Sequence, residues 1–210
     1  MFSIFINTIT DGTIVATLTD KDGTVTNYDL STYGYRINNS IYGGEISCDV
    51  EPLKSVDLST FRVLPGTKFA KDKNHVYYPL RVMCVDYIDC GVCFYSEIIV
   101  EKANPKLFKY LEKDYATDGT NVYFRGELIV DADGKTFRVI EGPEFFYFAV
   151  DKKKVYKHAE IFEEAAPSSF IYDKENVRNL IEGPYRYIIK DKNNVWEYTP
   201  PHSIKKINNK

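Results

Sequence analysis

Three histidines are the first candidates for acid–base chemistry in this chain: His75, His158 and His202. None of them has a Ser, Cys or carboxylate partner at a spacing that suggests a catalytic triad. A phosphate-binding loop is not indicated either, because Gly43-Gly44 is not followed by Lys-Ser or Lys-Thr. We therefore expect that the protein is not an enzyme and uses no cofactor.

Five aspartates recur at equivalent places in a repeated pattern and could be mistaken for a catalytic or calcium-binding set. They are Asp72, Asp118, Asp151, Asp173 and Asp191. A simpler interpretation is structural, since a turn Asp accepts hydrogen bonds from the amides that follow it. Residues 131–137, DADGKTF, resemble half of a calcium loop, but the distal Glu is missing and position 142 is Gly.

Four cysteines, Cys48, Cys84, Cys90 and Cys93, allow a zinc interpretation because the last two form a C-x-x-C pair. Their spacing is irregular, and no second C-x-x-C or His pair supports it. The alternative is that Cys48 and Cys84 are small core residues in strands. We predict no metal site, with free thiols in a reducing compartment and a disulfide only if the protein is exported.

Each recurrent Asp has an apolar or aromatic residue three places before it and a Val four places after it. Two β-rich runs around a polar four-residue break are typical of a β-hairpin. The predicted hairpins lie near residues 69–78, 115–124, 148–157, 170–179 and 188–197. Arg178 interrupts the pattern of the fourth copy, so we expect that hairpin to be distorted or exposed.

A second element precedes several of these copies. It is found in DLSTFRVL (57–64), NPKLFKYL (104–111) and DGKTFRVI (133–140), with PSSF (167–170) as a shortened form. Its polar or Pro start predicts one helical turn that places a Phe in the core before a strand. Units of this size cannot bury an apolar face alone, so we expect them to stack on their neighbours.

The best copy of the hairpin motif consists of Asp72, Lys73, Asn74, Val76, Tyr77 and Tyr78. Together with the D-x-x-T-F segment before it, this motif resembles the DKNYY repeat family of bacterial proteins, over roughly residues 57–198. The family is of uncharacterised function. The resemblance therefore implies a β-repeat fold and no particular activity.

These patterns predict an all-β protein of tandem irregular hairpin repeats, stacked into one elongated sheet array with one or two short helical turns. We expect an N-terminal β-meander unit over residues 1–56 and the DKNYY-like repeat region over 57–210. Residues 79–103 form the largest insertion, with two apolar strands around a turn. Residues 158–166, HAEIFEEAA, are the best helix candidate.

Charge and hydropathy narrow the classes of partner. The net charge of −3 argues against a general nucleic-acid binder, which needs a basic surface. No apolar run is long enough to span a membrane. We expect a cytoplasmic protein, or a periplasmic or surface protein if a signal peptide has been removed.

The abundance of tyrosine on predicted β-surfaces favours a non-enzymatic protein-binding module. The best specific hypothesis is a bacterial immunity protein that binds and neutralises a cognate toxin. The alternative is an exported surface or periplasmic repeat protein that binds glycan or an envelope component, because aromatic rings suit sugar stacking.

Two clusters are the candidate partner-binding residues. The first, in the insertion, consists of Arg81, Asp86, Tyr87, Asp89 and Tyr95. It mixes acidic and aromatic groups as an interface does, although the hairpin could instead only extend the sheet. The second consists of Glu160, Glu163 and Glu164, which could steer a basic toxin or simply be a solvated helix face.

Overall fold

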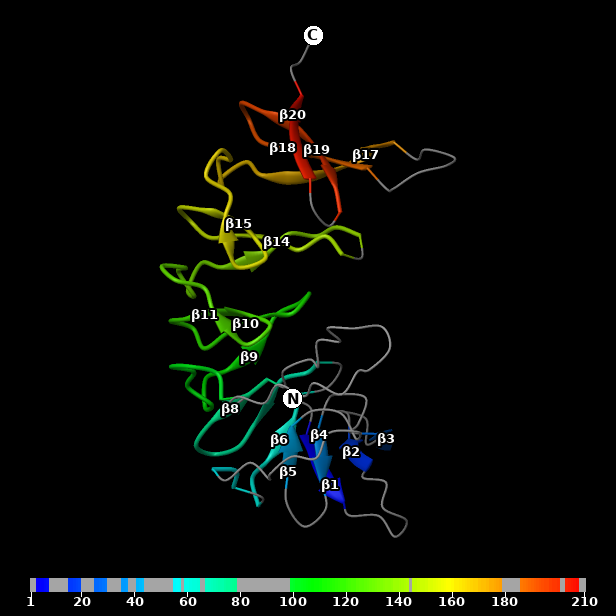
Figure 1. The fold of residues 1–210 in the computed structure, drawn as a ribbon, viewed down its shortest axis with the longest axis vertical. Helices are drawn as coiled ribbons and strands as arrows, with labels where there is room; N and C mark the ends of the chain where they lie inside the picture. Colours follow the sequence, from blue (N-terminus) through cyan, green and yellow to red (C-terminus); the bar gives the residue numbers. More distant parts are fainter. Residues whose placement is uncertain are drawn as a thin grey trace, which may run out of the picture. The chain divides into compact units, whose positions relative to one another are not determined.

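A computed structural model describes the chain at two levels of detail. For residues 3–7, 15–19, 25–29, 35–37, 41–43, 63 and 175–178 it describes the strand backbone, and it describes residues 55–57, 59–62, 64, 67–78, 99–143, 145–174, 186–200 and 203–207 more fully. All regular structure in these residues is β-strand, with no helix among them (Figure 1). The predicted all-β class is confirmed.

The chain divides into two compact units, which are 1–110 with 125–127, and 111–124 with 128–210. The predicted boundary near residue 56 lies inside the first unit. In that unit β1 (Ser3–Asn7), β2 (Val15–Thr19) and β3 (Val25–Asp29) form an antiparallel meander. The remaining pairings are β4 (Tyr35–Ile37) with β5 (Ile41–Gly43), and β7 (Ala70–Lys71) with both β6 (Arg62–Val63) and β8 (Val76–Tyr77).

The second unit begins with β10 (Tyr115–Thr117), which pairs with β11 (Val122–Phe124). In the chain, β9 (Lys109–Tyr110) precedes this pair and β12 (Glu127–Leu128) follows it. One four-stranded antiparallel sheet contains β13 (Arg138–Val139), β14 (Phe148–Val150), β15 (Val155–Lys157) and β16 (Glu160–Ile161). Another contains β17 (Ile171–Arg178), β18 (Arg186–Lys190), β19 (Val195–Thr199) and β20 (Ser203–Ile207).

Four of the five predicted Asp hairpins are confirmed: β7–β8, β10–β11, β14–β15 and β18–β19. In each, the amide of the Asp donates to the carbonyl three residues later, and this bond closes the turn. The pairs are Asp72 with His75, Asp118 with Asn121, Asp151 with Lys154, and Asp191 with Asn194. The polar break therefore folds as a four-residue turn in every one of these copies.

The hairpin predicted at 170–179 is wrong. Residues from Ile171 to Arg178 form one strand, β17, which pairs with β18 and has a register irregularity between Asp173 and Arg178. Ile171 opposes Lys190, one residue before the next turn Asp, just as Arg138 of β13 opposes Val150. The segment thus replaces β13 as the first strand before a hairpin, and the PSSF element belongs to the Asp191 copy.

The element before each hairpin, called the lead-in segment below, begins with a hydrogen-bonded turn. Examples are the bonds from the amide of Thr60 to the carbonyl of Asp57 (3.2 Å) and from Phe137 to Asp133 (3.0 Å). The predicted single turn is therefore present, although it is too short to be a helix. Its Phe is buried in every segment, at Phe61, Phe108, Phe137 and Phe170.

The hairpins of the second unit are stacked, and both faces of β14 are covered. Ala149 packs with the β10–β11 hairpin in a cluster that includes Tyr115 and Val122. Phe148 and Val150 point the other way and join a cluster with residues of β18 and β19. Since side chains alternate along a strand, a neighbour on each side buries all three residues of β14. Figure 1 shows these sheets following one another in chain order.

Candidate functional site

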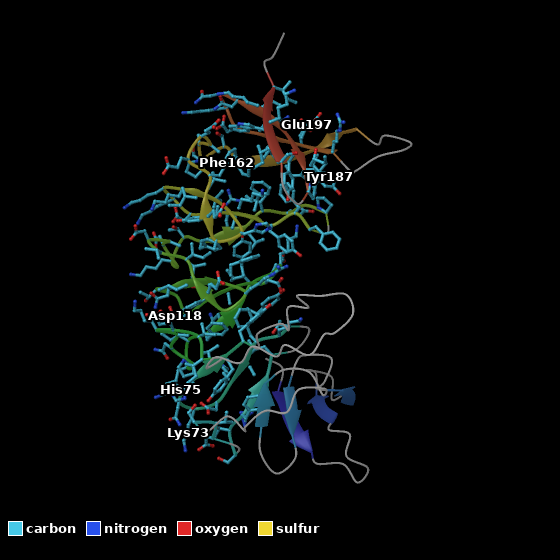
Figure 2. All side chains as sticks on the ribbon, viewed as in Figure 1. Lys73, His75, Asp118, Phe162, Tyr187 and Glu197 are labelled. Carbon is cyan, nitrogen blue, oxygen red and sulfur yellow. The ribbon has the colours of Figure 1, made fainter. Side chains whose placement is uncertain are left out.

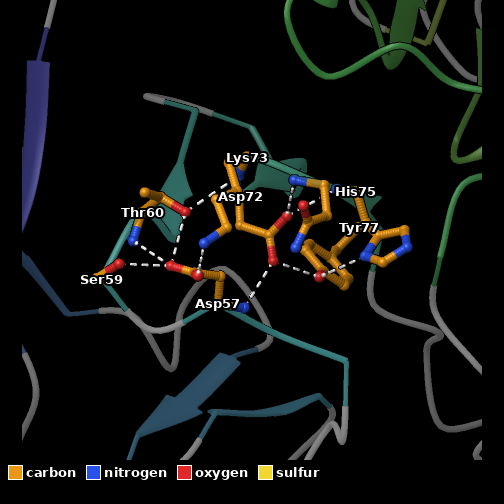
Figure 3. A network of polar contacts seen from close by, with 8 residues as sticks. Asp57, Ser59, Thr60, Asp72, Lys73, His75 and Tyr77 are labelled. Carbon is orange, nitrogen blue, oxygen red and sulfur yellow. Dashed lines mark hydrogen bonds and ion pairs between the residues drawn. The ribbon is translucent and has the colours of Figure 1, made fainter.

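The turn aspartates organise a polar network, and Figure 3 shows its geometry in the first copy. Asp72 Oδ1 accepts hydrogen bonds from the amides of Asn74 (2.6 Å) and His75 (2.7 Å). Asp72 Oδ2 accepts from the amide of Asp57 (2.7 Å) and the hydroxyl of Tyr77 (2.8 Å). One carboxylate therefore joins its own turn, the return strand and the lead-in segment.

The third copy repeats this arrangement. Asp151 Oδ1 accepts from the amides of Lys153 (2.6 Å) and Lys154 (2.7 Å). Asp151 Oδ2 accepts from the amide of Asp133 (3.0 Å) and the hydroxyl of Tyr156 (2.7 Å). Because two separate hairpins share all four contacts, the Asp–Tyr pair is a property of the repeat and not of one specialised site.

The second and fifth copies keep the Asp turn but vary the aromatic partner. The hydroxyl of Tyr123 lies 3.4 Å from Asp118 Oδ2, a longer contact. Asp191 accepts two turn amides and the amide of Ala166, each at 2.7 Å, but Trp196 replaces the Tyr. The indole Nε1 of Trp196 is buried and has no hydrogen-bond partner in the described part of the chain.

In three of the four copies a second bond links the lead-in segment to the residue after the turn Asp, whose amide donates to a hydroxyl. The pairs are Lys73 with Thr60 (3.0 Å), Lys152 with Thr136 (3.2 Å) and Lys192 with Ser169 (3.0 Å). In the second copy the amide of Gly119 binds Thr117 Oγ1 instead (2.9 Å), and Gly119 has a φ of 85°. In this copy Leu107 occupies the position of the Thr or Ser, so the amide of Gly119 bonds to a local acceptor.

The electrostatics of the network follow from burial and hydrogen bonding. Burial opposes ionisation of Asp72, but the bonds from the Asp57 amide and other donors outweigh it, and the pKa of Asp72 is lowered. The same balance lowers the pKa of Asp151 and of Asp191. Burial, followed by the hydrogen bond to Asp72, raises the pKa of the Tyr77 phenol.

These shifts predict how stability depends on pH. A lowered carboxyl pKa stabilises the folded state above the unfolded pKa, and this stabilisation is lost as protons bind. The free energy of unfolding should therefore fall as the pH is lowered below about 5. Buried tyrosines with a raised pKa act in the opposite sense, so stability should also fall above about pH 10. Urea unfolding from pH 3 to 11 measures both; a flat profile between pH 5 and 3 would contradict the carboxylate contribution.

The network is poorly suited to catalysis. Both oxygens of Asp72 and of Asp151 are already engaged by scaffold donors, so neither is available to take a proton from a substrate. His75 Nδ1 lies 3.4 Å from the Tyr77 hydroxyl, and Asn121, Lys154 and Asn194 replace His75 in the other turns. We conclude that Asp72, Asp118, Asp151 and Asp191 hold the repeat together, as the sequence predicted.

The predicted acidic helix at 158–166 is wrong. Glu160 lies in β16, where it opposes Lys157 of β15. Glu160, Glu163 and Glu164 are all exposed. His158 has a φ of 56° in the turn between these strands, which excludes a right-handed helix there. In the strand arrangement Phe162 faces the core and Ile161 is 39% exposed.

A shallow hollow of about 280 Å³ lies beside Glu163. Its lining consists of Lys153, Lys154, Val155, Ile161, Phe162, Glu163 and Ala165. The Phe162 ring contacts both sheets, since it lies 6.4 Å from the ring of Phe148 and 5.1 Å from that of Trp196. Figure 2 labels Phe162. The predicted acidic residue therefore lies beside an apolar centre, and Phe162 and Ile161 are residues that the sequence interpretation missed.

The other predicted site residues lie outside the described part of the chain. They are Arg81, Asp86, Tyr87, Asp89 and Tyr95 of the insertion. The four cysteines, Cys48, Cys84, Cys90 and Cys93, lie outside it as well. Neither the insertion surface nor the cysteine interpretation can therefore be compared with the structure.

The repeat tyrosines contradict one premise of the sequence interpretation, namely that they form a binding surface. Tyr77, Tyr115, Tyr123, Tyr156 and Tyr198 are all fully buried. The expected tyrosine-rich binding surface is therefore not formed by these residues, because their rings fill the space between stacked hairpins. Any partner must contact other side chains in this part of the molecule.

The fold and its recurrent network define a tandem β-hairpin repeat protein. Comparison with known families places residues 86–160 in the DKNYY family, so the predicted resemblance is confirmed. The match includes the Asp118 and Asp151 hairpins and is shorter than the expected 57–198. No curated protein and no solved structure matches this chain. No described helix is both long and apolar enough to cross a membrane.

Proposed function

We propose that this protein is a non-enzymatic β-repeat module that binds another protein. The observation that carries the proposal is the hollow beside Glu163, where exposed Ile161 and half-buried Phe162 lie among charged side chains. An apolar centre with a charged rim is the usual anatomy of a protein interface. The rigid sheets on either side of Phe162 hold this surface in place.

The charge of this surface indicates the kind of partner. Glu160, Glu163 and Glu164 are exposed within five residues of one another. The lining also includes Lys153 and Lys154, and Lys154 is 3.9 Å from Asp131, which offsets part of this positive charge. Three clustered carboxylates attract a basic protein and accelerate its association.

Within this class, the specific function that we propose is that of a bacterial immunity protein, which binds and neutralises a cognate toxin. Toxins that act on nucleic acid need a basic surface, and an acidic binding face complements it. The alternative of an exported protein that binds glycan or an envelope component was based on aromatic rings at β-surfaces. In the described part of the chain Tyr77, Tyr115, Tyr123, Tyr156 and Tyr198 are buried, so these rings do not favour it.

Charge reversal tests the proposal. Complexes isolated from the source organism with tagged wild-type chain should contain a basic protein whose activity the chain inhibits. Changing Glu160, Glu163 and Glu164 to Lys should weaken that complex at least about 30-fold, the scale of an interface hot spot. The folded state should be retained, because all three side chains are exposed.

The matched control changes Glu101, Glu112 and Glu127 to Lys, which gives the same net charge at exposed positions elsewhere. Its affinity should stay within about threefold of wild type, because distant exposed charges are screened by salt. Recovery of carbohydrate alone, or equal loss of binding in both triple variants, would contradict the proposed acidic binding face.

A further inference from the structure

The loop between β13 and β14 departs from the repeat in length. In the third copy the amide of Ile140 donates to the carbonyl of Phe148 (2.9 Å). The equivalent bond in the second copy joins Leu111 and Tyr115 (2.9 Å), so it encloses four fewer residues. Insertions in a repeat map to loops and often carry its binding function. Figure 1 shows this loop beside β14.

Phe145 in this loop has a conformation that is unusual for its residue type. It is 57% exposed, whereas Phe146 and Phe148 beside it are completely buried. Its φ is 62°, and it is the third residue of a turn in which the amide of Phe146 donates to the carbonyl of Pro143 (3.2 Å). Gly or Asn is preferred at such a position, because a bulky side chain is strained there. The loop therefore displays a large apolar ring in a strained backbone conformation.

Hydrogen bonds from Lys113 also hold the loop in place. Lys113 Nζ donates to the carbonyls of Gly142 (2.8 Å), Pro143 (3.1 Å) and Phe146 (3.1 Å), so all three ammonium protons are used. The same ammonium lies 5.3 Å from the centre of the Phe146 ring. These contacts fix the backbone on both sides of Phe145. A preformed conformation lowers the entropy lost when a partner binds.

The exposed charges at the base of the loop are paired. Glu141 is exposed, and its side chain is 2.7 Å from Lys174 Nζ. The ammonium of Lys113 is occupied by the loop carbonyls. These paired charges leave no unpaired basic group at the described base of the loop to attract the anionic surface of a membrane, so the exposed ring favours an apolar pocket on a protein.

We propose that Phe145 is a preformed anchor that enters an apolar pocket on the partner protein. This inference rests on the proposed function, that the chain binds a basic protein. It adds a second contact surface, separate in the chain from the Glu160–Glu164 cluster. A Phe in a strained, exposed position lowers stability, and such strained positions are typical of binding sites.

The first test needs no partner. Phe145→Gly should leave Tm unchanged or raise it by up to about 3 °C, because Gly adopts positive φ without strain. The control is Leu107→Gly, since Leu107 is equally exposed at 56% and has no positive φ; Tm should fall in this variant. A fall of more than about 5 °C for Phe145→Gly would show that Phe145 packs against the fold and would overturn the anchor assignment.

The second test identifies what Phe145 contacts. The full chain carrying p-benzoyl-phenylalanine at position 145 is irradiated in cells of the source organism, with the same label at position 107 as control. One protein should be cross-linked from position 145 only. With that protein purified, Phe145→Ala and Phe145→Gly should weaken its binding at least about 30-fold, whereas Leu107→Ala should change it less than threefold.

The outcomes separate this inference from the proposed function. Adducts to lipid, to a second copy of the chain, or to nothing beyond the control would overturn the anchor. Unchanged affinity in both Phe145 variants, with binding lost on reversal of the Glu160–Glu164 cluster, would overturn the anchor alone. If neither set of substitutions changes binding, both the anchor and the proposed binding face are wrong.

Discussion

Replacing Asp151 by Ala should lower the free energy of unfolding by about 2–4 kcal/mol, measured by urea denaturation. The change leaves four donors without their acceptor: the amides of Lys153, Lys154 and Asp133, and the buried hydroxyl of Tyr156. A buried donor that loses its partner costs more than an average hydrogen bond contributes. Asp151→Asn should cost less, because one carbonyl oxygen remains to accept the turn amides.

The matched control is Asp131→Asn, which keeps a residue tolerant of the positive φ of 62° at this position. The Asp131 side chain is 77% exposed and lies 3.9 Å from Lys154. This substitution should change stability by less than about 0.5 kcal/mol, as exposed ion pairs do. If Asp151→Ala were as stable as this control but failed to bind the partner, the carboxylate would belong to a binding site and not to the scaffold.

Replacing Phe148 by Ala should cost about 3–5 kcal/mol, the range for a large aromatic side chain in a packed core. Phe148 is completely buried and contacts the rings of Phe146, Phe170 and Tyr198 at centroid distances of 4.7, 5.5 and 5.1 Å. Because it lies between two sheets, the cavity would weaken the packing of both. Denaturant midpoints and thermal unfolding measure the loss.

Phe145→Ala is the control for this second experiment, since it removes the same side chain three residues away. The Phe145 ring is exposed, so the free energy of unfolding should change by less than about 0.5 kcal/mol. If both variants lost a similar amount of stability, the assignment of Phe148 as buried and Phe145 as exposed would be contradicted. The stacking of β14 between two clusters would then need revision.

The Asp hairpins were predictable because their information is local. An Asp accepts the amides two and three residues after it, which requires only a turn of four residues, and so the pattern around Asp72 or Asp191 is sufficient. The lead-in segments were predictable for a similar reason, since a polar start followed by Phe indicates one turn. The bond from the amide of Asp57 to Asp72 was not predicted, because it joins residues 15 apart in the chain.

The fourth copy shows where a local pattern misleads. The residues around Asp173 in the sequence favour a turn. In the structure, however, Ile171 and Tyr172 lie in β17, which pairs with β18. Lys190 Nζ then binds Asp173 Oδ2 at 2.7 Å, so the carboxylate pairs with a neighbouring strand instead of turn amides. Pairing between strands overrides a turn preference, because sheet stability depends on neighbours.

The candidate site was predictable only in part. Glu163 was identified from charge, but the neighbouring Phe162 was missed, because a helix was expected where β16 forms. Phe145 was also missed. The available signal was that EGPEFFYF has four more residues than the corresponding loop of the second copy, which an alignment of the repeats on their Asp residues would reveal.

The sequence by itself determined the all-β class, the Asp turns and the order of the hairpins, because turns and β-propensity act over a few residues. Only the tertiary structure decided which faces are covered. Stacking buries Tyr77 and Tyr156 against aspartates and lead-in residues, and it leaves Phe145 and Ile161 exposed. The physical reason is that a short strand can be buried on one face or both, and this depends on the hairpins before and after it.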